Sequence, residues 1–329
     1  MATSPTVDPR PGPPAGGTSG RGPAPAHHPE RRVGTLAGLA AYSLWGIFPL
    51  VFNLLDAVAP GEILIHRIVW SFVVVLVLLA VRRERHWFRA VRSLPGALAR
   101  LSLAAALIAN NWLVYIWAVT NDHVVEAALG YYINPLITVA LGVVVLREQL
   151  SRPQAIALGF GLAAVLVLTV GYGQVPWISL VLACSFGGYG FMKKSVPVGA
   201  VTSLAVETMV LVPAALAALI ALQVRGDAAF LHGSVGRDAL LVGLGVVTAV
   251  PLLLFGTAAR RIPLSVLGLL QYVTPTLQLL LGLVVFHEPM PVERLIGFVL
   301  VWIALGVLAA DALAARRRAL APVVVTEAS

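Results

Sequence analysis

Ten long apolar runs are the feature that most limits what this chain can fold into. They lie at about 33–55, 61–81, 97–119, 124–146, 153–171, 176–192, 200–222, 239–259, 264–286 and 292–312. Each is close to the roughly 20 residues that an α-helix needs to cross a hydrocarbon core of about 30 Å. Lipid offers the backbone no hydrogen-bond partner, so such runs must be helices, and the short alternating segments of a membrane β-barrel do not occur. We therefore expect an all-α membrane protein with ten transmembrane helices.

The composition agrees with this fold class. Hydrophobic residues make up 59% of the 329 residues and charged residues 12%, against roughly 25% charged in an average soluble domain. The net charge of +8 could indicate nucleic-acid binding, but the basic residues stand at the ends of the apolar runs. Membrane topology explains that placement better than a phosphate-binding face does. We therefore expect a lipid bilayer around the chain and no nucleic-acid partner.

Sequence motifs argue against catalysis. The single cysteine, Cys184, lies inside an apolar run, which excludes internal disulfides and a cysteine-based metal site. The chain has no H-E-x-x-H, no Walker loop, no G-x-S-x-G elbow and no His/Cys cluster with metal-ligand spacing. We expect no enzyme activity, no metal and no cofactor. Without a nucleotide-binding loop the chain by itself cannot be an ATP-driven pump.

The distribution of Lys and Arg predicts the orientation. If the N-terminus is cytoplasmic, 19 of these residues fall on the cytoplasmic side and three outside, while Arg67 lies within a span. Cytoplasmic loops of membrane proteins carry such an excess of positive charge. The chain should be a multi-pass inner-membrane protein with both termini in the cytoplasm.

A stretch at 129–148 recurs 140 positions later at 269–288. The informative matches are Tyr132/Tyr272, Pro135/Pro275, Gly142/Gly282 and Glu148/Glu288. Proline at matching positions of two membrane segments indicates a transporter built from internal repeats. Five spans per repeat is an odd number, so the second repeat must be inverted relative to the first. Inverted repeats form two related gates around one midplane site, which is the basis of alternating access.

This register divides the chain into four parts. Residues 1–30 are rich in Pro and Gly and are expected to form a disordered tail. The first repeat should span 31–172, the second 173–312, and a cytoplasmic tail 313–329. A Gly-x-x-x-Gly pattern at Gly34 and Gly38 offers a contact face for a homodimer.

The paired prolines are candidate hinges. Pro135 has no N–H and frees the carbonyl of Tyr131, and Pro275 does the same for that of Gln271. One interpretation is a kinked, cavity-lining helix in each repeat. The alternative is a kink that serves packing alone, because proline is common in membrane helices.

His66 and Arg67 stand about one turn inside the second run. An Arg near the bilayer centre costs about 2.5–3.5 kcal/mol on insertion scales, so it should face a cavity or a partner. The pair could orient an anionic or polar group of a substrate. Two alternatives stay open: an ion pair with Glu62 or Glu126, and snorkelling of the side chain to the interface.

Buried carboxylates in spans are candidates for coupling protons. Glu207 lies about seven residues into its span and Glu126 in a first turn. The alternative for each is a salt bridge or an interhelical hydrogen bond. Glu148 and Glu288 stand at helix ends beside basic residues, and we expect them to be structural, paired with Arg152 or Arg294.

Further polar and aromatic side chains within the spans could line a substrate cavity. The alternative is that they serve as hydrogen-bonding contacts between helices and as interfacial aromatic belts. The candidates for substrate binding are Asn111, Trp112, Tyr132, Asn134, Gln271 and Tyr272.

Six runs of the sequence are distinctive: Ala41-Tyr-Ser-Leu-Trp-Gly-Ile-Phe-Pro49, Glu62-Ile-Leu-Ile-His-Arg-Ile-Val-Trp-Ser71, Asn111-Trp-Leu-Val-Tyr-Ile-Trp-Ala-Val-Thr-Asn121, Glu126-Ala-Ala-Leu-Gly-Tyr-Tyr-Ile-Asn-Pro135, Glu207-Thr-Met209 and Gln271-Tyr-Val-Thr-Pro275. In these runs the chain resembles the RarD proteins of the EamA group in the drug/metabolite transporter superfamily. The resemblance covers roughly residues 33–313. It implies a ten-helix inner-membrane transporter of two inverted five-helix EamA repeats in a family described as chloramphenicol-sensitive. The residues that fall inside the matched runs are His66, Arg67, Asn111, Glu126, Tyr132, Asn134, Pro135, Glu207, Gln271, Tyr272 and Pro275.

We therefore expect a secondary transporter of a small metabolite or drug, with protons as the candidate coupling ion. A different class of function stays open: a non-transporting receptor or scaffold whose partner binds the basic loop at 82–100. That alternative predicts that neutralising the loop abolishes function, whereas changes in the cavity have no effect.

Overall fold

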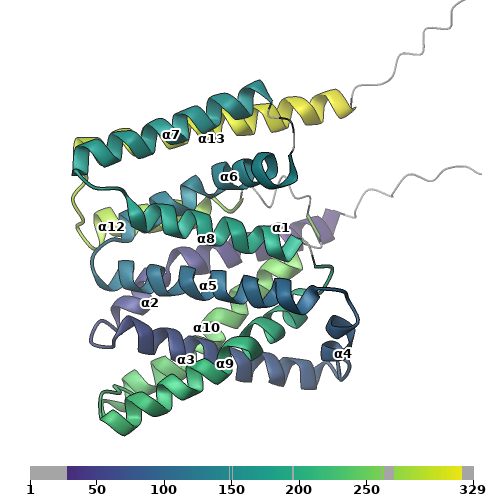
Figure 1. Cartoon of the computed structure of the whole chain (residues 1–329), viewed down its shortest axis with the longest axis vertical. Coiled ribbons are helices and arrows are strands. Elements are labelled where there is room, and N and C mark those ends of the chain that lie inside the picture. The colour runs from purple at the N-terminus through teal and green to yellow at the C-terminus, as the bar shows by residue number, and fades with distance from the viewer. Residues whose placement is uncertain are drawn as a thin grey trace, which may run out of the picture.

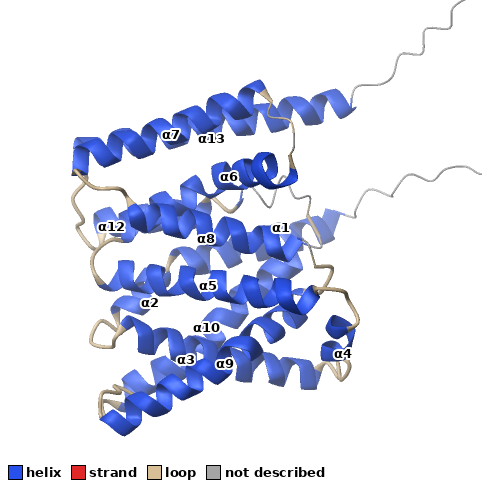
Figure 2. Cartoon of the chain, in the orientation of Figure 1, coloured by secondary structure: helices blue, strands red, loops and turns tan. Residues whose placement is uncertain are grey.

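The computed structural model describes the backbone of residues 28–320, apart from residues 148, 150, 195, 260 and 263–269. Side chains at 28–29, 146, 172, 194, 200, 259 and 312–320 are not described either. The regular structure of the described residues is entirely helical, as Figure 2 shows. The helices are α1 (His28–Gly46), α2 (Phe48–Asn53), α3 (Pro60–Val81), α4 (Trp87–Arg92), α5 (Ala97–Thr120), α6 (Val124–Leu146), α7 (Arg152–Tyr172), α8 (Trp177–Lys194), α9 (Ala200–Arg225), α10 (Val235–Ala259), α12 (Val273–Val284) and α13 (Val292–Leu320). The expected all-α fold is confirmed.

Among the described residues, eight predicted spans are helices long and apolar enough to cross a membrane. The sixth predicted span, 176–192, corresponds to α8, and the ninth, 264–286, to the shorter apolar helix α12. Residues 264–269 of that ninth span lie outside the described residues. Helix α13 continues past the predicted end of its span at 312, because no proline or glycine stands between there and Leu320 to end it.

The long helices lie side by side and run back and forth between two faces of the molecule (Figure 1). One face, on the left of Figure 1, carries the connections at 54–59, 173–176, 226–234 and 285–291; we call it the loop face. The opposite face carries α4, the start of α1 and the end of α13; we call it the terminal face. The described ends of the chain therefore lie on the same side.

Contacts between helices of the two halves come in matched sets. Helix α6 packs against α8, and α12 packs against α1; α5 packs against α8, and α10 against α1. Likewise α10 packs against α3, and α5 against α9. Three pairs that occupy the same place in the two halves meet directly: α3 with α9, α6 with α12, and α7 with α13.

The first predicted span is broken in two. Helix α1 ends at Gly46 and α2 begins at Phe48, with Pro49 in its first turn, where the missing N–H costs no helical hydrogen bond. At the break, a Cβ on Gly46 would lie 2.7 Å from Leu277 Cδ1, so the absent side chain lets α12 approach. The sequence predicted a continuous helix here.

The glycine pair at the start of α1 is used within the chain. A Cβ on Gly34 would lie 2.6 Å from Arg261 Cβ, and one on Gly38 would lie 3.3 Å from Ala258 Cβ. Helix α10 and the residues after it therefore occupy the face that the sequence offered for a homodimer. A second copy of the chain would have to use another surface.

The two paired prolines have different local settings. Pro135 lies inside α6, as expected for a proline within a membrane helix. Pro275 is the third residue of α12, which begins at Val273 after a turn at 271–272. Because the first turn of a helix has no acceptor for its N–H groups, proline there interrupts no helical bond. The role of both prolines as hinges stays a prediction.

Candidate functional site

Arg67 is buried within the helix bundle, with 4% of its surface exposed. Helix α3 begins at Pro60, so Arg67 stands two turns into it, about 10 Å along the axis. Its Nε donates to Thr248 Oγ1 of α10 at 3.0 Å. Its guanidinium carbon lies 4.1 Å from the ring centroid of Trp112 on α5. The side chain is thus held between three helices and does not reach for the interface.

Aromatic rings surround this guanidinium on further sides. Its carbon lies 5.5 Å from the ring centroid of Phe48 and 5.8 Å from that of Phe52, both on α2. Within the described part of the chain, no carboxylate oxygen lies within 4.0 Å of Arg67, so neither Glu62 nor Glu126 pairs with it. The buried positive charge of Arg67 is therefore stabilised by aromatic rings and by the hydroxyl of Thr248.

A hydrogen-bonded chain of side chains adjoins Arg67. Asn111 Nδ2 donates to the Leu182 carbonyl and to Ser185 Oγ, each at 3.0 Å, and its Oδ1 accepts from Tyr131 at 3.1 Å. The rings of Tyr131 and Tyr115 lie edge to face at 5.7 Å. Because every polar atom of Asn111 is engaged with α6 or α8, it acts as a contact between helices, which was the alternative to substrate binding.

Gln278 on α12 completes this region. Its Nε2 donates to Tyr115 Oη at 2.8 Å and to the Trp45 carbonyl at 3.4 Å. Its Oε1 is buried and accepts no hydrogen bond. A polar residue within an apolar run was visible in the sequence, but its link to Tyr115 was not. Of the neighbours of Arg67, Trp112 was a candidate from the sequence, whereas Thr248, Phe48 and Phe52 were not singled out.

Tyr132 and Tyr272, which match in the sequence repeat, meet in space. Their rings stack with centroids 6.3 Å apart and planes at 17°. The Tyr132 hydroxyl lies 2.6 Å from Thr276 Oγ1. Gln271 is half-buried in the turn before α12, and Asn134 Oδ1 is buried beside α8 without a hydrogen-bond partner. Tyr132, Gln271 and Tyr272 therefore lie where α6 meets α12, apart from the contacts of Arg67, whereas Asn134 faces α8.

Glu126 is engaged at the loop face. Its Oε1 lies 3.1 Å from Arg294 Nη2 of α13 and 3.2 Å from His123 Nδ1. Arg294 Nη1 also donates to the Pro289 carbonyl at 2.9 Å and lies 3.8 Å from Glu288 Oε2. The salt bridge that stood as the alternative for Glu126 is present, and so is the expected pairing of Glu288 with Arg294.

Glu288 also caps a helix of the other half. Its two oxygens accept hydrogen bonds from the backbone N–H groups of Val124 and Val125, the first residues of α6. Burial raises the pKa of the Glu288 carboxyl, although these N–H groups and Arg294 favour its ionised form. Its structural role is as expected. Glu148, its counterpart in the repeat, lies outside the described residues.

Glu207 on α9 is 1% exposed and fully engaged. Its Oε1 accepts from Ser203 Oγ at 2.6 Å and lies 3.1 Å from Lys193 Nζ of α8. Tyr189 donates to its Oε2 at 3.2 Å and accepts from Lys193 at 2.9 Å. The salt bridge weighed as the alternative to proton coupling is therefore present here too.

His66 points away from Arg67. Its ring packs against Phe230 with centroids 4.5 Å apart, and its Nδ1 accepts from Trp70 Nε1 at 3.1 Å. Its Nε2 lies 4.0 Å from Glu62 Oε1. The sequence had suggested that His66 and Arg67 act on the same substrate group. The structure does not bring their side chains to one point.

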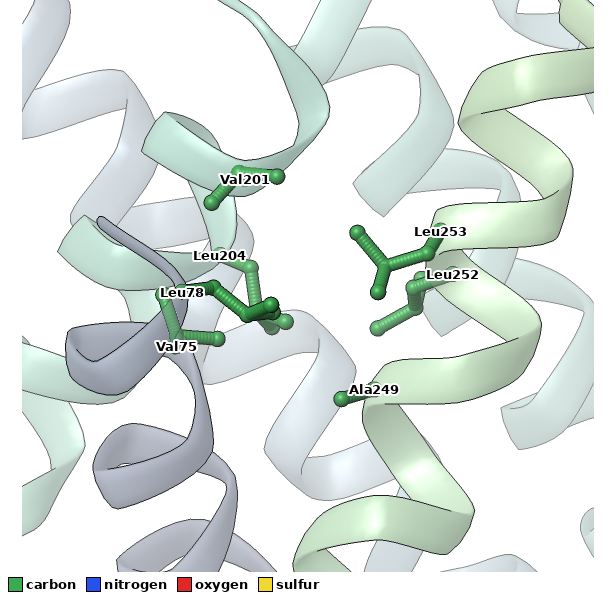
Figure 3. A pocket seen from close by; sticks show the side chains of 7 residues that line it. All are labelled: Val75, Leu78, Val201, Leu204, Ala249, Leu252 and Leu253. Carbon is green, nitrogen blue, oxygen red and sulfur yellow. The ribbon is translucent and has the colours of Figure 1, made fainter. Parts of the chain in front are cut away.

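A small pocket opens between α3, α9 and α10, and its lining is entirely apolar (Figure 3). The lining residues are Val75, Leu78, Val201, Leu204, Ala249, Leu252 and Leu253. Such a pocket offers no hydrogen bond to a polar ligand, so it is not the candidate substrate site. In the described residues, no three His, Cys, Asp or Glu side chains gather in a way that could hold a metal ion.

Comparisons with known proteins agree with this architecture. The model of the EamA-like transporter family matches residues 32–170. Protein RarD of Streptomyces exfoliatus is 52% identical, with 88% of this chain and 92% of that protein covered. An uncharacterized transporter of Pseudomonas aeruginosa is 42% identical (87% and 96% covered), and Protein RarD of Escherichia coli K12 is 39% identical (88% and 98% covered).

A solved crystal structure matches with a TM-score of 0.52 at 22% identity, covering 84% of this chain and 97% of its own. At that identity the likeness concerns the fold alone. The curated relatives, in contrast, are similar in sequence along most of their length. The chain therefore belongs to the RarD proteins of the EamA-like transporter family.

Proposed function

We propose that the chain is a secondary transporter that moves a small amphipathic anion across the inner membrane by alternating access. The observation that carries the proposal is Arg67, a buried cation with no carboxylate partner among the described residues. A charge kept in a membrane span at a cost of about 2.5–3.5 kcal/mol marks a functional position. The family's description as transporters favours this over a receptor or scaffold acting through the 82–100 loop.

The environment of Arg67 suits an anion with an apolar body. Trp112 covers the guanidinium, Thr248 takes its Nε, and the rings of Phe48 and Phe52 stand around it. A guanidinium recognises planar anions such as a carboxylate by two parallel hydrogen bonds. Arg67 would hold the anionic group, while the aromatic rings hold the remainder of the substrate.

The inverted repeat of the two halves is part of the proposal. It is supported by the stacking of Tyr132 on Tyr272, because equivalent residues meet only near the axis that relates two halves. The matched helix contacts described above support it as well. With the same offset of 140 residues, Arg67 and Glu207 hold equivalent positions with opposite charge. The boundaries we propose for the repeats are 31–172 and 173–312.

The loop face would be the outer face, since the positive-inside distribution puts both termini in the cytoplasm. Three contacts there join the two halves: Glu126 with Arg294, Glu288 with the first residues of α6, and Glu62 with the backbone of 229–230. Rocking of the halves about Pro135 and Pro275 would have to break these contacts to open the site outward. A coupling proton at Glu126 or Glu207 would have to displace a bound cation.

Transport can be tested in proteoliposomes with a panel of radiolabelled carboxylates of low passive permeability, each measured with and without a pH gradient. Arg67→Ala should reduce flux roughly 10- to 100-fold, the loss expected for a charge-assisted hydrogen-bonded contact of about 1.5–3 kcal/mol. Size-exclusion chromatography should show the same monodisperse protein as the wild type.

Arg89→Ala is the matched control, because Arg89 is an exposed arginine in the 82–100 loop. It should leave flux unchanged. Wild-type flux in Arg67→Ala would remove this arginine from the mechanism. Absence of transport across the whole panel would count against an anion transporter, and loss of function in Arg89→Ala would favour the loop-based alternative.

A further inference from the structure

The first turns of α3 hold a second buried polar group that substrate binding at Arg67 does not use. His66 is 0% exposed and Glu62 is 3% exposed, one turn apart on the same helix. The connection between α9 and α10, residues 226–234, covers both of them; we call it the outer strap. A histidine ring buried beside a carboxylate can bind a proton only at a ring nitrogen that carries no hydrogen.

The hydrogen bonds of the ring show which of its two nitrogens carries the hydrogen. The indole N–H of Trp70 can only donate, so His66 Nδ1, which lies 3.1 Å from it, must be the accepting, unprotonated nitrogen. The neutral ring therefore carries its hydrogen on Nε2. That nitrogen is buried, has no hydrogen-bond partner, and lies 4.0 Å from Glu62 Oε1.

Glu62 is what ties the outer strap to α3. Its two oxygens accept from the backbone N–H of Ala229 at 2.9 and 3.0 Å, and Oε1 also accepts from that of Phe230 at 2.9 Å. On α10, Asp238 accepts from the N–H of Leu231, so a second carboxylate is bonded to the strap. Arg237, beside Asp238, donates to the Ala229 carbonyl.

We propose that His66 is a proton-binding site whose occupation loosens the outer strap; as the site of the coupling ion, it rests on the proposed transport function. A proton from the outer solution binds the lone pair of Nδ1. The nitrogen can then no longer accept from Trp70, since two donors would face each other. The imidazolium turns its Nε2–H toward Glu62 and competes with the backbone N–H groups of Ala229 and Phe230. Loss of the proton from Nδ1 restores the bond from Trp70 and the strap.

This assignment differs from the carboxylates singled out in the sequence. Glu126 and Glu207 each already hold a cation at 3.1 Å. His66 has a neighbouring carboxylate, Glu62, and an unengaged nitrogen. The ring points away from Arg67, so an added charge on it would act on the outer strap.

The proton itself is the probe, so the first measurement needs no transport substrate. The full chain is labelled with ¹⁵N-histidine in nanodiscs and titrated by NMR, and the His66 signals are identified by their loss in His66→Gln. At high pH we expect a neutral ring with the hydrogen on Nε2, and a change to the doubly protonated ring within the range of about pH 5 to 8 where histidines titrate. Trp70→Phe keeps the histidine but removes the donor, so its transition should move to higher pH.

Hydrogen–deuterium exchange reports the consequence at the strap. After correction for intrinsic rates, the N–H groups of 229–230 should lose about tenfold protection in wild type below the transition. His66→Gln should show no such change. His86→Gln, at an exposed histidine next to α4, should behave as wild type.

Two outcomes would overturn the proposal. One is a His66 signal that keeps a single neutral form across this pH range. The other is a titrating His66 with unchanged protection at 229–230. Either result would leave anion transport through Arg67 standing, because the flux assay with Arg67→Ala tests that separately.

Discussion

The contact between Arg67 and Trp112 allows a quantitative test of how this fold tolerates a buried charge. The guanidinium carbon lies 4.1 Å from the Trp112 ring centroid, and both side chains are buried. A double-mutant cycle with Arg67→Met and Trp112→Leu isolates their interaction, because each change removes it and leaves an apolar side chain in place.

The expected magnitudes follow from the surroundings. A desolvated cation–π contact is worth about 2 kcal/mol, and the bond from Arg67 Nε to Thr248 contributes about 1.5–3 kcal/mol. The cost of the charge within the membrane is about 2.5–3.5 kcal/mol. The favourable contributions together exceed this cost by about 0–2.5 kcal/mol, so Arg67→Met should lower the free energy of unfolding by no more than about 2.5 kcal/mol. Trp112→Leu alone should be destabilising, and the coupling energy should be about 2 kcal/mol.

Reversible unfolding in mixed micelles by added SDS, followed by circular dichroism, measures all four proteins of the cycle. Phe52→Leu serves as the matched control, because its ring centroid is 5.8 Å from the guanidinium carbon and its coupling to Arg67 should be much smaller. A coupling energy for Trp112 that does not exceed that of Phe52 would refute the reasoning. So would a large loss of stability in Arg67→Met, since the charge would then be structural.

Two further predictions concern packing and pH. A Cβ on Gly245 would lie 2.5 Å from the Trp70 carbonyl oxygen, a backbone atom of α3 that cannot easily move away. Gly245→Ala should therefore lower stability by about 1–3 kcal/mol in the same unfolding assay, whereas Gly243→Ala, with open space around it, should not. For Glu288, burial raises the folded-state pKa above the ordinary value of 4.5, so its contribution to stability is present below that value and is lost as pH rises through the folded pKa. Glu288→Gln should remove this pH dependence of the thermal midpoint. Glu288→Ala leaves two N–H groups of α6 uncapped and should lower stability by about 0.5–2 kcal/mol at all pH values. An unchanged pH profile in Glu288→Gln would contradict the assignment.

Local sequence properties account for the parts of the fold that were predicted correctly. Length and apolarity of a run decide whether it crosses a membrane as a helix, and both can be read from consecutive residues. The pairing of Glu288 with Arg294 was also within reach, because six positions separate them. The break at Ile47 was missed, since a Pro in the first turn of one helix and a Pro within a longer helix look alike in sequence.

Partners from distant parts of the chain could not be predicted. Glu126 pairs with Arg294, 168 positions away, and Glu62 binds backbone N–H groups 167 positions away. Backbone donors have no sequence signature at all. Likewise, Thr248 was one hydroxyl among several in apolar runs until α10 was seen to approach α3 at Gly245.

The sequence by itself determined that this chain is a helical membrane protein of the RarD type, and it singled out Arg67, because a charge in an apolar span is costly wherever it stands. Only the tertiary structure decided what each charged side chain faces. Glu126 and Glu207 face cations, Arg67 faces ring surfaces, and His66 faces a carboxylate and an indole. The physical reason is that the energy of a buried charge depends on atoms within a few ångströms, and in this bundle those atoms come from helices far apart in the chain.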